Sequence, residues 1–161
     1  MSPRALSPAA VRALTAQETG EIFLMCVTID HDDLAAPLCF VNNTEPIVRH
    51  GTTFYGWPFE VALPDEREDA LPMPQLRIDN VDRRILEGIR ALTSAPTVTL
   101  EVVLASALDA PEPEAGPATV SLRGIDYDAL TITGTLAPED VLNEPAMQYS
   151  FTPDRFPGLF P

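Results

Sequence analysis

Prolines divide this chain into short segments, and that constrains its fold more than any other feature. The sequence contains 17 prolines in 161 residues. Proline removes a backbone donor and interrupts both helices and central strands, so the prolines mark breaks between successive elements. Between the prolines lie brief apolar runs, the clearest of which is Thr97 to Ala105, where Val98, Leu100, Val102 and Leu104 alternate with other residues. Such alternation indicates β-strands.

Further strands are expected at Ile22–Ile29, Leu38–Val48, Leu76–Ile78, Thr119–Arg123 and Leu130–Leu136. The first is apolar on both alternations, which is typical of a strand covered on both faces, and it forms a hairpin with the second. The stretch from Thr52 to Leu63 reads as a strand broken by Pro58, which belongs at a sheet edge or a bulge and should bend the chain.

Two short helices complete the pattern. Ser7 and Pro8 have the residue types of an N-cap and a first helical position, and Gly20 is the expected end. Asp79 or Asn80 begins a second, amphipathic helix that continues to Leu92. The fold class predicted is therefore mainly β with two short helices, an antiparallel β-barrel or β-sandwich with an extended C-terminal arm. We expect one domain over residues 1–142 and the arm over residues 143–161.

Charge and composition exclude several classes of function. The net charge is −14, which disfavours nucleic-acid and anionic-membrane binding. All ten basic residues are arginine, so amine chemistry such as a Schiff base is excluded. No apolar run approaches the roughly 20 residues that span a bilayer, so no membrane insertion is expected. Cys26 and Cys39 fit no metal spacing and are expected to be free and buried.

A search for catalytic or ligand-binding patterns gives only weak candidates. Asp30–Asp33, which includes His31, could offer ligands to a divalent ion, although a solvated turn is the simpler interpretation. The pairs Asp79/Asp82 and Asp126/Asp128 could be imagined as an acid and base, but a helix cap and a strand turn explain them more simply. The expectation is no catalytic residue, no cofactor and no metal.

The most informative short stretch is the aromatic patch around the single tryptophan. Its large side chains are Phe54, Tyr55, Trp57 and Phe59. They could belong to the core, or they could anchor a protein contact, as large aromatics do at interfaces. The C-terminal arm adds Phe151, Phe156, Leu159 and Phe160, more apolar area than an unattached tail should expose. We expect this arm to work between subunits, with packing over its own barrel as the alternative.

The order of these features resembles an uncharacterised tail-module family of tailed bacteriophages, whose genes lie near those for the tape measure and the tail-tip hub. The motifs that carry the resemblance are Arg4–Ala9, Val27–His31, Thr53–Pro64, Leu76–Ile85, Thr97–Ser106 and Phe151–Phe160.

The resemblance implies a virion structural protein of the tail tip, a ring-forming distal-tail or hub-type homo-oligomer of three or six copies that links tail tube to tip and lines the DNA channel. It would be made in the host bacterial cytoplasm and contact other tail-tip proteins, with DNA passing transiently. An acidic loop, Asp65, Glu66, Glu68 and Asp69, or the loop Asp109–Glu114, is expected to face the lumen, where like charge prevents sticking. The alternatives are a tail assembly factor absent from the mature particle and a cell-wall-acting enzyme used during infection.

Overall fold

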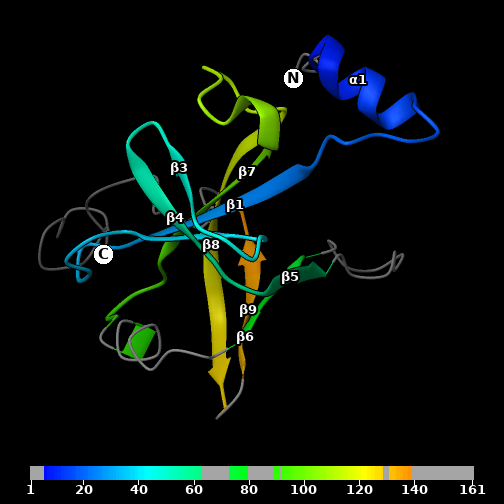
Figure 1. Cartoon of the computed structure of the whole chain (residues 1–161). Helices are drawn as coiled ribbons and strands as arrows, with labels where there is room; N and C mark the ends of the chain where they lie inside the picture. The colour runs from blue at the N-terminus through cyan, green and yellow to red at the C-terminus, as the bar shows by residue number, and fades with distance from the viewer. Residues whose placement is uncertain (1–5, 63–72, 80–88, 91, 129–130, 139–161) are drawn as a thin grey trace, which may run out of the picture.

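The computed structural model describes residues 6–62, 73–79, 89–90, 92–128 and 131–138. Their order along the chain is α1 (Pro8–Thr15), β1 (Phe23–Asp30), β2 (Leu38–Val41), β3 (Ile47–Arg49), β4 (Thr52–Gly56), β5 (Phe59–Ala62), β6 (Gln75–Asp79), β7 (Thr97–Leu104), the 3-10 turn η1 (Ala105–Ala107), β8 (Ala115–Tyr127) and β9 (Thr131–Ala137) (Figure 1). The mainly β prediction is confirmed. The predicted arm 143–161, the acidic loop 65–69 and all of the second predicted helix except its last residues lie outside the described residues.

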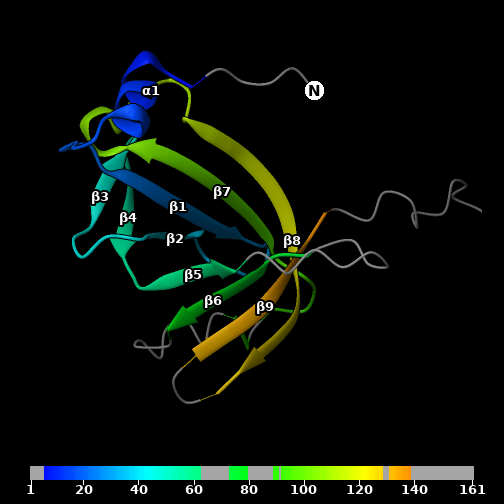
Figure 2. The ribbon, with the colours of Figure 1, turned by 90° about the vertical axis from the view of Figure 1, so that its right-hand side faces the viewer.

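The nine strands form one mixed sheet in the order β3-β4-β2-β1-β7-β8-β9-β6-β5. Every neighbouring pair is antiparallel except β2 and β4, which are parallel. The predicted β1–β2 hairpin is confirmed. The sheet curls so that β1, β2 and β7 lie across from β5, β6 and β9 (Figure 2). Over the described residues it is a single sheet that is not closed into a barrel, since its end strands β3 and β5 pair with β4 and β6 and not with each other.

The long strand β8 produces the curl. It pairs with β7 through its first part and with β9 through its second, and both pairings contain a register shift. Gly124 lies at the shift toward β9 with φ +59°, a left-handed conformation that glycine adopts without strain. The bulges bend the ribbon, and Figure 2 shows β8 curving from the upper to the lower half. The sequence pattern predicts only Thr119–Arg123 in this strand, because the acidic, proline-rich run that ends at Pro117 is typical of a loop.

Apolar side chains from both halves fill the inside of the curl. The core lies between the two halves and contains Val27, Ile29, Phe40, Leu76, Ile78, Ile89, Val98, Leu122, Ile132 and Leu136. Ile89 comes from the second predicted helix, where its burial agrees with the apolar face assigned to it. A second cluster covers the other face of β1, where alternate residues Leu24 and Cys26 meet Ile47 and Phe54. The prediction that β1 is covered on both faces is therefore confirmed.

The β3–β4 hairpin that covers this second face is held by a buried cation. Arg49 is 5% exposed, and its Nε lies 3.2 Å from Glu101 Oε2 on β7. Its Nη1 donates to the carbonyls of Leu108 and Ala110. The carboxylate and two carbonyls accept from Nε and Nη1 of the guanidinium, which offsets much of the cost of burying it.

Two predicted boundaries are wrong for local reasons. Helix α1 has the predicted cap, since Ser7 Oγ accepts from the N–H of Ala10, but it ends at Thr15 and not at Gly20. Ala10 and Ala13 are its buried residues, and the next position on that face, Gln17, is polar and exposed, so burial no longer supports the helix. The predicted strand Leu38–Val48 is two strands, because the turn-forming run Asn42–Pro46 interrupts it.

Only Trp57 and Pro58 join two strands that lie seven places apart in the strand order. These residues connect β4 to β5, which belong to opposite halves of the curled sheet, and the chain bends at Pro58 as the proline break predicts. The Trp57 N–H donates to Val41 O at 3.0 Å, and its ring Nε1–H donates to Asp79 O at 2.6 Å. The Asp79 N–H in turn donates to Pro58 O at 3.2 Å. One tryptophan thus holds β2 and β6 together, and its ring packs against Phe40 with 6.2 Å between centroids.

Trp57→Phe should therefore destabilise the protein. The change leaves the half-buried Asp79 carbonyl without its indole donor, and an unsatisfied buried acceptor costs about 1–3 kcal/mol. The free energy of unfolding from denaturant titration measures the effect. Tyr55→Phe is the control, since Tyr55 is 60% exposed and loses only a hydroxyl. Equal stability of the two variants would show that the corner does not hold the sheet.

The cysteines give a second prediction. Both are free and buried, as expected from the sequence. Burial, with a smaller contribution from Glu101, raises the pKa of Cys26 to about 11, and burial also raises the pKa of Cys39. At pH 8 only about one Cys26 in a thousand is then the reactive thiolate. Ellman's reagent should modify neither thiol of the native protein over minutes and both after denaturation in guanidinium; rapid labelling of native protein would contradict this.

Candidate functional site

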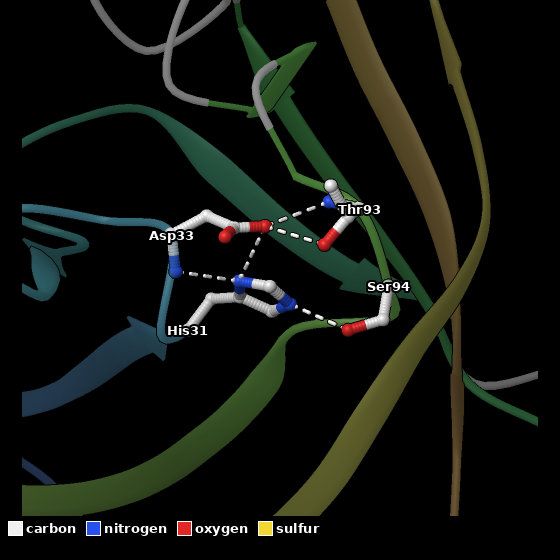
Figure 3. A network of polar contacts seen from close by, with 4 residues as sticks. All are labelled: His31, Asp33, Thr93 and Ser94. Carbon is white, nitrogen blue, oxygen red and sulfur yellow. Dashed lines mark hydrogen bonds and ion pairs between the residues drawn. The ribbon is translucent and has the colours of Figure 1, made fainter.

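The only polar network that combines a histidine, an acid and hydroxyls in the described residues joins the β1–β2 turn to the segment before β7 (Figure 3). His31 Nε2 lies 2.7 Å from Ser94 Oγ. Asp33 Oδ2 accepts from Thr93 twice, from the N–H at 2.9 Å and from Oγ1 at 2.6 Å. The same oxygen lies 3.4 Å from His31 Nδ1. Serine, histidine and aspartate thus follow one another as in a hydrolase triad.

The direction of the protons argues against catalysis by this triad. The Asp33 N–H donates to His31 Nδ1 at 3.0 Å, so Nδ1 of the neutral ring is an acceptor. The ring proton is then on Nε2, which donates to Ser94 Oγ. A general base needs the opposite arrangement, with Nε2 accepting the serine proton. Asp33 is also committed to Thr93, so the network is suited to joining two loops rather than to activating Ser94.

The surroundings of the network are polar and shallow. A depression of about 260 Å³ lies beside it, lined by Asp30, His31, Asp32, Ser94, Ala95 and Thr97. No group of three or more His, Cys, Asp or Glu side chains that could hold a metal ion occurs among the described residues. The solvated turn expected at Asp30–Asp33 is present, with Leu34 N–H donating to His31 O. The His31 side chain itself, however, is only 8% exposed.

A second candidate is the groove at the corner of the sheet, which we call the Trp57 groove. Its volume is about 530 Å³, and its lining is Asn42, Asn43, Thr44, Gly56, Trp57, Pro58 and Phe59. The two walls approach closely at Gly56, where a Cβ would lie 2.6 Å from Asn43 O, so only glycine fits. Trp57 and Phe59 are half-buried, and both pack against the main core while lining the groove.

The predicted interface residues are therefore placed in three ways. Phe54 is 7% exposed and belongs to the second core cluster, which is the core interpretation of the aromatic patch. Tyr55 points away from it and is 60% exposed. Trp57 and Phe59 have one side in the core and one in the groove. Phe151, Phe156, Leu159 and Phe160, and the acidic residues Asp65, Glu66, Glu68 and Asp69, lie outside the described residues.

The second acidic loop, Asp109–Glu114, uses two of its carboxylates within the chain. Asp109 Oδ1 accepts from the His50 N–H at 2.8 Å, and Glu114 Oε2 accepts from the Ser7 N–H at 2.9 Å. These bonds fix the β3–β4 turn and the start of α1. These two hydrogen bonds could not be predicted from the sequence, because their donors are backbone N–H groups, which do not distinguish one residue from another. Thr93 and Ser94 were missed for a similar reason, since they meet His31 and Asp33 only in the fold.

The chain was compared with models of known protein families. A family model described as a domain of unknown function, DUF1833, matches residues 9–151. The chain belongs to this family. No curated protein matches it.

The range matched by the DUF1833 model includes all nine described strands, both candidate sites and the first part of the predicted arm. Residues 152–161 lie beyond the matched range. Among the described residues, no helix of this DUF1833 domain is long and apolar enough to cross a membrane.

The His31 network predicts a pH-dependent contribution to stability. The Thr93 hydroxyl, and then its N–H, lower the pKa of Asp33 below its ordinary value of 3.8. A carboxyl whose pKa is lowered by folding stabilises the protein above its unfolded pKa and loses that effect as pH falls through the folded pKa. The melting temperature of Asp33→Ala should thus be below that of wild type at pH 7, and the gap should narrow below about pH 4.

Asp32→Ala is the matched control, because it removes a neighbouring exposed carboxylate that has no hydrogen bond to Thr93. Its melting temperature should follow that of wild type across the same pH range. A gap for Asp33→Ala that stays constant from pH 7 to pH 3 would contradict the assignment.

Proposed function

We propose that this DUF1833 chain is a structural subunit of a bacteriophage tail tip, a ring-forming distal-tail or hub-type protein that links tail tube to tip. The observation that carries the proposal is that the curled sheet has two edge strands, β3 and β5, which differ from each other in sequence. β3 and β5 end the strand order, and among the described residues neither has a partner on its outer side. A closed ring with cyclic symmetry needs two different surfaces on each subunit, and unpaired edges are suited to pairing with another chain.

Exposed apolar side chains support the same proposal. One set lies on α1 and in the segments that flank it in the chain: Leu6, Val11, Leu14 and Ile22, between 38% and 61% exposed. Another is on the outer face of the β3–β4 hairpin. Val48 pairs with Thr53, and Tyr55 follows two residues later on the same face; Val48 and Tyr55 are 56% and 60% exposed. Apolar side chains that share one face, as Val48 and Tyr55 do, mark contact surfaces better than single exposed residues do.

The charge is compatible with a channel-lining role. Each chain has a net charge of −14, so a ring of several copies presents a strongly negative field. Like charge prevents the phosphate contacts that would hold passing DNA. The proton direction in the His31 network favours a structural subunit over a cell-wall enzyme, because His31 Nε2–H donates to Ser94 Oγ and cannot accept the serine proton in this tautomer.

Purified phage particles test the proposal. Quantitative mass spectrometry of intact particles should find this chain in three or six copies per tail, and a map of the tail should place it as a ring between tube and tip. Its presence in infected cells and absence from finished particles would favour the assembly-factor alternative and overturn the proposal. If each particle contained one copy and the purified chain released fragments from cell walls, the cell-wall enzyme alternative would be favoured.

A further inference from the structure

We propose that the Trp57 groove binds the C-terminal segment, residues 143–161, of a neighbouring copy of this chain. This inference rests on the proposed ring and names the contact between its subunits. The groove offers an aromatic and proline surface of Trp57, Pro58 and Phe59 opposite a wall of two asparagines and a threonine. Among the described residues, no charged side chain lines it. Its volume of about 530 Å³ is within the range that holds a few large side chains.

The asparagine wall offers polar groups for a peptide backbone. Asn42 Oδ1 accepts from the Met25 N–H at 2.6 Å, and Asn43 Nδ2 donates to Glu45 O at 3.1 Å. These bonds fix both amides, and each amide has a second polar group that can donate to or accept from an extended chain. A rigid aromatic surface with fixed amides is the kind of site that recognises proline-rich segments, whose conformation costs little entropy to order.

The C-terminal segment has the matching chemistry. It contains Pro145, Pro153, Pro157 and Pro161, which exclude it from a helix or a sheet interior. Phe151, Phe156, Leu159 and Phe160 are the large apolar side chains that such a groove accepts. Its only charged side chains are Glu144, Asp154 and Arg155, so an uncharged groove imposes little desolvation cost on it.

The position of the chain end favours a neighbouring copy. Trp57 contacts Asp79, which pairs with Thr131 at the start of β9. The C-terminal segment follows the other end of β9, at Ala137, about 20 Å along the strand. Figure 2 shows the corner between β4 and β5 on the left and the end of β9 on the right. A segment that starts at one end of each subunit and a groove at the other end form a head-to-tail contact, the type that closes into rings.

The segment is long enough for this contact. Residues 139–161 can extend up to about 75 Å, several times the length of β9. The same reach would let the segment return to its own groove, so the experiment must separate the two sources. Trp57 is the only tryptophan of the chain, and the segment contains none. Tryptophan emission therefore reports occupancy of the groove without interference.

Three full-length variants test the inference. Thr44→Arg places a long charged side chain in the groove from an exposed position. Phe156→Ser with Phe160→Ser weakens the segment and leaves the groove intact. Thr119→Arg is the matched control, since it adds the same charge at an exposed position on β8 away from the groove. Circular dichroism spectra should be the same for all, which keeps folding separate from binding.

The expected result has two parts. Wild type and Thr119→Arg should show Trp57 emission that moves to shorter wavelength as protein concentration rises, together with self-association in sedimentation velocity. The groove variant and the segment variant should each stay monomeric over the same concentrations. Mixed in equal amounts they should form a 1:1 complex and no larger species, because one supplies the only intact segment and the other the only intact groove.

Other results overturn the inference. Emission that differs between wild type and the segment variant at every dilution, without self-association, would show that the segment occupies its own groove. Association that survives both variants, or that is absent up to the solubility limit, would show that the groove does not bind the segment between copies. The test needs no phage particles, so a chain found in tails that fails it refutes only the contact. A chain that passes but is missing from tails refutes only the proposed function.

Discussion

The fold depends on one corner, where Trp57 and Pro58 carry the chain from one end of the sheet to the other. Two residues cannot join β4 to β5 in a flat sheet, where these strands, seven places apart in the order, would lie more than about 30 Å apart. The sheet must therefore curl until β2 and β6 both reach Trp57, whose backbone N–H donates to Val41 O on β2 and whose indole Nε1–H donates to Asp79 O on β6. The apolar core inside the curl, the open edges at β3 and β5, and the groove at the corner all follow from this closure.

Local patterns in the sequence predict most of the elements. Ser7 and Pro8 locate the start of α1, alternation locates β7, and continuous apolarity shows that β1 is covered twice. What these patterns could not predict is pairing between distant segments. The parallel contact of β2 with β4, and the sharing of β8 between two partners, depend on contacts that no short window contains. The proline break at Pro58 predicted a bend but not which strands the bend would bring together.

The candidate sites were harder to predict than the fold because their chemistry depends on backbone groups. Asp33, Asp109 and Glu114 all read as loop acids, yet each accepts from a backbone N–H of a distant residue. The His31 network shows why geometry alone is also insufficient. Its heavy atoms follow the order of a triad, and a single N–H from Asp33 reverses the direction in which the imidazole can move a proton.

The division of β8 between two partners has a consequence for how the protein folds. Ser121 pairs with Thr97 on one side and with Ala137 on the other, so neither half of the sheet has a complete strand order without β8. The halves therefore cannot melt as separate units, and unfolding should be a single cooperative transition with the slowest amide exchange at the middle of β8. Because β8 pairs with strands that precede it in the chain, folding cannot be completed until β8 and β9 have formed. The edge strands stay exposed until then.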